Sequence, residues 1–125
     1  MTYSIHFNAE EGIIEVTFRG NLDIQTAKAA LQEIVDMIAK EQCFQVLSDL
    51  REAHMALSLA EIFDFPQQLN NLSDRVNLNA RAVRRAIVTH KTDQMSFYEN
   101  VFSNRGYSAM IFDDPAKAKA WLRKE

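Results

Sequence analysis

The sequence contains residue types that could form a hydrolytic site, but not in a recognised arrangement. Ser58 has the chemistry of a nucleophile, and a nucleophilic serine needs a base within hydrogen-bond reach and an oxyanion hole. No Gly-x-Ser-x-Gly turn surrounds it. Glu61 follows Ser58 by three residues, a spacing typical of a capping box at the start of a helix. We therefore expect no catalytic triad at this serine.

Residues that bind metal ions or phosphate are too few or too scattered to predict a site. His6, His54 and His90 lie far apart, and none has a second ligand at a recognised spacing. Three glycines in the whole chain leave no phosphate-cradling loop. Cys43 is the only cysteine, so we expect a buried structural thiol and a reducing compartment. No metal ion and no cofactor are expected.

Length and charge narrow the class of protein. The 125 residues match the common size of one domain, so 1–125 is expected to be a single domain. The net charge of −3 disfavours nucleic acid or an anionic membrane as a partner, and Arg81, Arg84 and Arg85 are interpreted as a solvated patch. No apolar run approaches the roughly 18 residues of a membrane span, and the start lacks the order of a signal peptide. These features predict a cytoplasmic protein without a transmembrane segment.

Hydrophobic periodicity predicts alternating strands and helices after an opening hairpin. Apolar and polar residues alternate over 3–8 and 14–19, the period of half-buried strands. Apolar residues at helical spacing over 24–40, after an N-cap at Asp23, predict a long amphipathic helix. The other predicted strands are 44–50, 85–90 and 108–112, and the other predicted helices begin after Ser58, Asp93 and Asp114.

This β-β-α-β-α-β-α-β-α order defines the expected fold class. Repeated strand–helix units require a mostly parallel sheet with right-handed crossovers. We expect an α/β fold with a five-stranded, mostly parallel sheet, an opening antiparallel hairpin and about four helices. Residues 44–50 are apolar on both sides and are expected to form a buried strand.

Four segments that span nearly the whole chain stand out in this order: IIEVTFRGNLD, FQVLSDLREA, RAIVTH and FDDPAKAKAWL. Together they resemble the STAS domain, and in detail the bacterial SpoIIAA-like group. The resemblance implies a STAS fold and the regulatory role of an anti-sigma factor antagonist. It also places Asp49 at the end of the central strand and Ser58 where such antagonists are phosphorylated by a partner kinase. The surrounding Ala56-Leu57-Ser58-Leu59 departs from the acidic, small-residue loop of that family.

The same group resembles the lipid-binding lobe of CRAL-TRIO transfer proteins, which raises the hypothesis of a non-polar ligand. Open α/β sheets bind ligands beyond the carboxyl ends of their strands, where Asp49, Arg51 and His90 are expected. The helix after Ser58 points its positive end at the same rim, which favours an anion. The alternative is that Asp49 binds local backbone and Arg51 pairs with a neighbouring carboxylate.

An interrupted helix supplies the most suggestive apolar surface. Pro66 removes a backbone hydrogen bond and clashes with the preceding turn, so we expect a kink or restart near Phe65 and an end by about Leu72. The diverging pieces would open an apolar pocket, with 73–84 as a lid. Dense core packing is the alternative. The predicted lining is Leu59, Ile62, Phe63, Phe65, Leu69, Tyr98 and Phe102, with Asp49, Arg51 and His90 orienting a polar head.

The same surface predicts self-association. Small domains often bury spare aromatic area in a two-fold interface, so we expect a homodimer with Phe63 or Phe65 near its centre. The leading hypothesis is a non-enzymatic binding module that holds a small non-polar ligand or a protein partner. The alternatives are a regulator switched at Ser58 and a small hydrolase or transferase that uses the rim residues.

Overall fold

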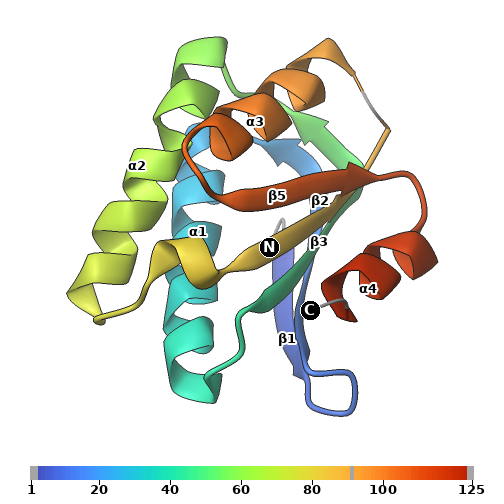
Figure 1. Cartoon of the computed structure of the whole chain (residues 1–125). Helices are drawn as coiled ribbons and strands as arrows, with labels where there is room; N and C mark the ends of the chain where they lie inside the picture. Colours follow the sequence, from blue (N-terminus) through green and yellow to red (C-terminus); the bar gives the residue numbers. More distant parts are fainter. Residues whose placement is uncertain (1–2, 91, 124–125) are drawn as a thin grey trace.

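The computed structural model describes residues 3–90 and 92–123 and confirms the expected order of elements (Figure 1). The described strands form one sheet in the order β1-β2-β3-β4-β5, in which β1 is antiparallel to β2 and all other pairs are parallel. The elements are β1 Tyr3–Asn8, β2 Ile13–Leu22, α1 Ile24–Glu41, β3 Gln45–Met55, α2 Leu59–Arg75, a 3₁₀ turn at Ala80–Ala82, β4 Arg84–Val88, α3 Asp93–Asn104, β5 Ser108–Phe112 and α4 Pro115–Arg123.

Helices cover both faces of the sheet but unequally. Figure 1 shows α1, α2 and α3 on one face and α4 on the other. Successive side chains of a strand point to opposite faces, so Ile87 joins the larger core beneath α1–α3, whereas Ala86 and Val88 join a smaller cluster beneath α4. Because β3 is buried between β2 and β4, the expected burial of 44–50 is confirmed for the residues that form its strand.

Local capping signals place the helix ends. Asp23 accepts a hydrogen bond from the Thr26 amide and begins α1. Ser58 and Glu61 form the reciprocal capping box that begins α2. The predicted cap of α3 is wrong by one residue, because Thr92 accepts from the Met95 amide and Asp93 is the first residue of the helix. The start of each long helix is therefore determined by its own sequence.

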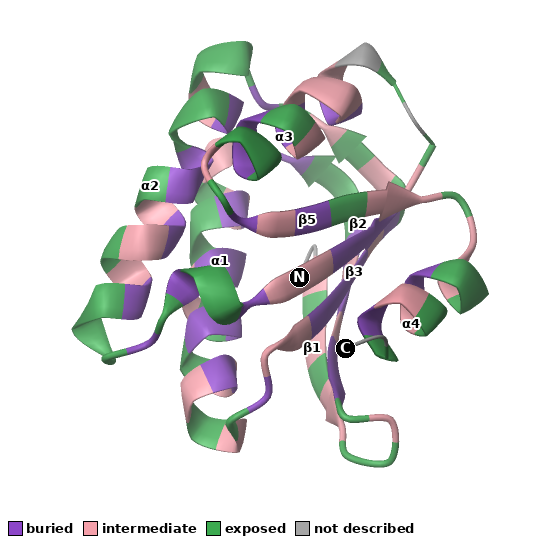
Figure 2. Cartoon of the chain, viewed as in Figure 1, coloured by how far each residue is buried: buried purple, intermediate pink, exposed green. Residues whose placement is uncertain are grey.

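The predicted break in α2 is wrong, because the helix runs through Pro66 to Arg75 without interruption. Pro66 is itself fully buried, and Ile62 and Leu69 lie on the same buried side of the helix (Figure 2). Residues four apart share one face of a helix, so this stripe binds the turns before and after Pro66 to the same core. The burial offsets the hydrogen bond that proline cannot donate.

β2 and β3 are longer than the alternation pattern predicted. Gly20 lies within β2 rather than at its end, and its φ of +73° is a conformation that glycine adopts without strain. A register shift between Thr17 and Arg19 lets the strand continue beside 52–55. This extension carries the carboxyl ends of β2 and β3 together beyond the end of β4. None of the helices in the described ranges is long and apolar enough to cross a membrane.

Candidate binding sites

The seven apolar residues predicted to line one pocket lie in three different environments. Ile62, Leu69 and Phe102 are buried in the core, so core packing, the alternative reading, holds for these three. Phe65 and Tyr98 face a small interior cavity. Leu59 and Phe63 point outward and are 58% and 55% exposed. Without the divergence expected at Pro66, α2 gathers no single pocket from these side chains.

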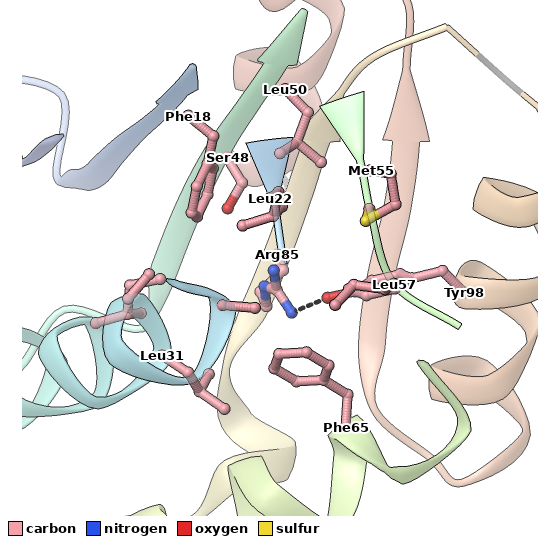
Figure 3. A pocket seen from close by; sticks show the side chains of 13 residues that line it. Phe18, Leu22, Leu31, Ser48, Leu50, Met55, Leu57, Phe65, Arg85 and Tyr98 are labelled. Carbon is pink, nitrogen blue, oxygen red and sulfur yellow. Dashed lines mark hydrogen bonds between the residues drawn. The ribbon is translucent and has the colours of Figure 1, made fainter. Parts of the chain in front are cut away.

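The interior cavity lies between α1, strands β2–β4, α2 and α3, and has a volume of about 40 Å³. Figure 3 shows its side chains as sticks. A volume of this size holds a few water molecules or one compact ion, and it has no room for an acyl chain. The lining is Phe18, Leu22, Ala27, Ala30, Leu31, Ile34, Ser48, Leu50, Met55, Leu57, Phe65, Arg85 and Tyr98.

A larger cleft of about 450 Å³ lies at the carboxyl ends of the strands, where rim residues were expected. Arg51 and His90 both line it, so the structure brings these two candidates to one place. Leu22, Leu50 and Met55 line both the cleft and the interior cavity and separate the two. No three His, Cys, Asp or Glu side chains within the described ranges come together as a metal site.

Asp49 and Arg51 satisfy each other at this rim. The Arg51 amide and Nε donate to Asp49 Oδ1 at 3.0 Å each, and Nη2 donates to Oδ2 at 2.8 Å. The hydrogen bond from the Arg51 side chain holds the pKa of the Asp49 carboxyl below its usual value, although partial burial opposes this shift. This geometry agrees with the alternative given in the sequence analysis, in which Asp49 binds local backbone and Arg51 pairs with a neighbouring carboxylate. The two side chains form a local ion pair.

Ser58 is exposed at the start of α2, where its Oγ accepts from the Glu61 amide at 3.1 Å. The Glu61 carboxylate in turn accepts from the Ser58 amide at 2.8 Å. The predicted cap is therefore confirmed. Capping of α2 accounts for a serine at this position without any catalytic role.

Beside Ser58 lies an open groove of about 580 Å³, which we call the α2 groove. Leu59 and Phe63 are four residues apart and form its apolar wall on one face of α2. The guanidinium of Arg105 lies 4.4 Å from the centroid of the Phe63 ring and covers part of that side chain. The groove is lined by Ile24, Lys28, Leu59, Ala60, Glu61, Phe63, Asp64, Gln68 and Phe97.

The three arginines interpreted as a solvated patch point to three different places. Arg81 lies over the Tyr107 ring at 4.8 Å, and Arg84 lies over the Trp121 ring at 4.2 Å. Arg85 points into the interior cavity, where Nη1 donates to the Tyr98 hydroxyl (Figure 3). Sequence reasoning missed Arg85 as a site residue. Strand alternation was the available signal, since Arg85 is two residues from the buried Ile87.

Comparisons with known proteins identify the fold. No protein-family model matches this chain, and a comparison with curated proteins finds no match. The anti-sigma factor antagonist SpoIIAA is similar in its unphosphorylated form, with a TM-score of 0.58, 8% identity and coverage of 98% of this chain and 99% of that one. Its phosphorylated form from Bacillus has a TM-score of 0.57 and 11% identity, with coverage of 97% and 99%.

Two further solved structures agree. An anti-sigma factor antagonist from Mycobacterium paratuberculosis has a TM-score of 0.60 and 13% identity, with coverage of 98% of this chain and 95% of that one. An uncharacterised protein with a SpoIIAA-like fold from Shewanella loihica has a TM-score of 0.57 and 16% identity, with coverage of 96% and 91%. The predicted resemblance is confirmed at the level of fold: this chain has the SpoIIAA-like STAS fold.

Proposed function

We propose that this protein is a non-enzymatic binding module that recognises a protein surface through the α2 groove. The observation that carries the proposal is the exposure of Leu59 and Phe63, at 58% and 55%, side by side on one helix. Large apolar side chains gathered in one groove are typical of an interaction site. Aromatic residues in such positions often dominate binding energy.

The groove supports a protein partner better than a small non-polar ligand. The interior cavity, at about 40 Å³, is far smaller than the several hundred Å³ that are usual for small-molecule sites. The α2 groove reaches about 580 Å³ but is more open, which suits a protein surface better than a ligand that must be surrounded. The names of the similar structures add support at the level of fold, because an anti-sigma factor antagonist acts on another protein.

Self-association is the first partner that we propose. A two-fold interface must be self-complementary, and Lys28 faces the same groove as Glu61 and Asp64, so charges of both signs are present. Phe63 would lie near the axis of the dimer. Phe65, the other residue expected there, is 6% exposed and packs inward, so that part of the prediction is wrong.

A second candidate function is regulation by phosphorylation at Ser58. Its hydroxyl is exposed and immediately precedes Leu59, so a phosphate there would lie at the edge of the groove. A helix N-terminus tolerates the added negative charge, but Glu61 already occupies the Ser58 amide and would repel the phosphate. Phosphoserine at this position in protein from the native host would support the switch, and its absence under all growth conditions would oppose it.

Site-specific photo-crosslinking in the native host tests the groove. A photoreactive phenylalanine analogue replaces Phe63 in one variant and Met110, which is 42% exposed on β5, in the matched control. We expect one discrete adduct from position 63 and none of the same mass from position 110. Its mass identifies a second copy of this chain or a different protein. No adduct, or identical adducts from both positions, would reject the α2 groove as the binding surface.

A cytoplasmic location and the absence of enzymatic activity belong to the same proposal. The buried free thiol of Cys43 suits a reducing compartment. The committed pairing of Asp49 with Arg51 and the capping role of Ser58 support a non-catalytic rim.

A further inference from the structure

We propose that the interior cavity is an anion site, in which Arg85 binds a compact monoanion such as chloride or formate. This site is separate from the α2 groove and does not depend on the proposed function. Its central observation is a positively charged side chain on the core face of a central strand, with no carboxylate in the cavity that surrounds it.

The position of Arg85 is unusual for a charged residue. On β4 it lies on the same face as Ile87, and its register partner on β3 is Val46. Both of these neighbours are buried apolar residues of the larger core. Strand alternation therefore directs this half-buried side chain to the face that carries the larger core rather than to the face that α4 covers.

The guanidinium has aromatic and hydroxyl contacts but no countercharge. It donates to the Tyr98 hydroxyl and lies 5.6 Å from the ring centroids of Tyr98 and Phe102. None of the thirteen residues that line the cavity is acidic, and Arg85 has no ion pair among the described residues. Arg85 is only partly buried, but its Nε atom is buried and has no hydrogen-bond partner. The guanidinium is therefore available to an anion that enters the cavity.

Three hydrogen-bond donors are available to that anion. Arg85 Nε and Ser48 Oγ are buried and have no hydrogen-bond partner in the structure. The Tyr98 hydroxyl accepts from Arg85 and keeps its own hydrogen to donate. Figure 3 shows these groups facing the same space from β3, β4 and α3. Buried unsatisfied polar groups are uncommon in native proteins and call for an explanation.

Size limits the ligand. The volume of about 40 Å³ admits a halide or a formate-sized carboxylate and excludes a branched or long-chain acid. One guanidinium balances one negative charge. The apolar side chains of Leu22, Leu50 and Met55 line both the cavity and the rim cleft and lie between them.

Water is the competing occupant, and thermal unfolding distinguishes it from an anion. The melting temperature is measured at constant ionic strength in sodium gluconate, whose anion is too large for the cavity, and with gluconate replaced stepwise by chloride or formate. We expect the melting temperature of the wild-type protein to rise and then level off as chloride or formate is added, because a ligand that binds only the folded state stabilises it. No difference between the three salts would overturn the proposal, and an equal rise with hexanoate would overturn the size limit.

Variants assign the effect to the cavity. Arg85→Met is expected to abolish the anion-dependent rise, whereas Arg51→Gln, which alters an arginine already paired with Asp49, should retain it. If Arg85→Met does not fold, Tyr98→Phe keeps the charge, removes one donor and should weaken the apparent affinity several-fold. If Arg51→Gln loses the anion-dependent rise in melting temperature, or if both cavity variants keep it in full, the anion binds elsewhere and the proposed site is wrong. Crystals soaked in bromide should show an anomalous peak beside Arg85.

Discussion

Arg84 and Arg85 are neighbours on β4, yet their side chains enter opposite layers of the molecule and meet opposite surroundings. Arg84 Nη2 donates to the Trp121 carbonyl at 2.8 Å, and Nη1 donates to the Leu122 carbonyl at 3.4 Å. These carbonyls belong to the last turn of α4, which lacks intrahelical donors and carries partial negative charge. Arg85 meets a hydroxyl and two aromatic rings. Arg84 thus satisfies the carbonyl groups at the end of α4, whereas the charge of Arg85 has no carboxylate partner among the residues that line its cavity.

The difference extends to the two faces of the sheet. Beneath α4, the fully buried Ala86 and Ala118 bring helix and sheet close together, and Leu122 is 1% exposed. Beneath α1–α3, larger side chains surround a cavity that contains two unsatisfied polar groups. Dense packing on one face and a polar-edged cavity on the other suggest that the first serves stability and the second is kept for binding.

The largest expected effect is on the α4 face. Leu122→Ala should lower the free energy of unfolding by about 2–5 kcal/mol, because a tightly packed cluster cannot collapse around the lost atoms. Urea denaturation measures the change. Lys117→Ala, on the exposed side of the same helix, is the control and should shift stability by no more than about 0.5 kcal/mol. A loss below about 1 kcal/mol for Leu122→Ala would mean that this face is not close-packed.

The next prediction sets the two arginines directly against each other. Arg84→Met should cost about 1.5–3 kcal/mol, since hydrogen bonds from a charged group to the helix carbonyls are lost. Arg85→Met in gluconate buffer should be neutral or stabilising, because it removes a half-buried cation without a carboxylate partner among the described residues and keeps a side chain of similar length. Equal destabilisation of both variants in chemical denaturation would show that Arg85 is a structural residue like its neighbour.

A smaller effect on stability is expected when a valine is introduced on each face of the sheet. Ala86→Val should destabilise by about 1–3 kcal/mol through overpacking beneath α4. Ser48→Val replaces an unsatisfied buried hydroxyl beside the cavity and should be neutral or stabilising by about 1 kcal/mol. Thermal unfolding of both variants in gluconate gives the comparison. Matching losses would indicate that the cavity cannot accept the added atoms.

Much of the architecture was predictable because its signals are local. The Asp23 cap, the Ser58–Glu61 box and the alternation of short strands each depend on a few adjacent residues. The continuity of α2 was not predictable in this way. The tolerance of Pro66 depends on its burial among residues distant in sequence, and no local rule reports that burial.

The candidate sites were predicted less well than the fold, for a related reason. Arg51 and His90 were placed correctly at one rim, because the carboxyl ends of parallel strands share one edge. Leu59, Phe63 and Phe65 were treated as one surface, although helical spacing separates the buried Phe65 from the other two. Arg85 was hidden in a run of arginines whose charge resembles a solvated patch. Strand alternation places Arg85 on the face of Ile87 and Arg84 on the opposite face, and the sequence alone does not tell that the face of Ile87 carries the larger core.

The last and smallest effect concerns the edge of the α4 face, where cations do have carboxylate partners. Glu11, in the hairpin loop between β1 and β2, accepts from Lys119 Nζ at 2.9 Å and Arg123 Nη2 at 2.6 Å. The hydrogen bond from Lys119 is the largest cause that holds the pKa of the Glu11 carboxyl below its usual value, and the charges of Lys119 and Arg123 add to it.

A folded-state pKa below the unfolded one means that this contact stabilises the protein above the usual carboxyl pKa and loses its effect as pH falls through the lowered value. The wild type should therefore melt slightly above Glu11→Gln at pH 7, and the difference should close below about pH 4. Because these side chains are at the surface, 1 M salt should also reduce it. Melting curves from pH 7 to pH 3 provide the measurement. A difference in melting temperature that is independent of both pH and salt would show that Glu11 acts by packing rather than by charge. The contrast between this ion-paired edge and Arg85 would then be wrong.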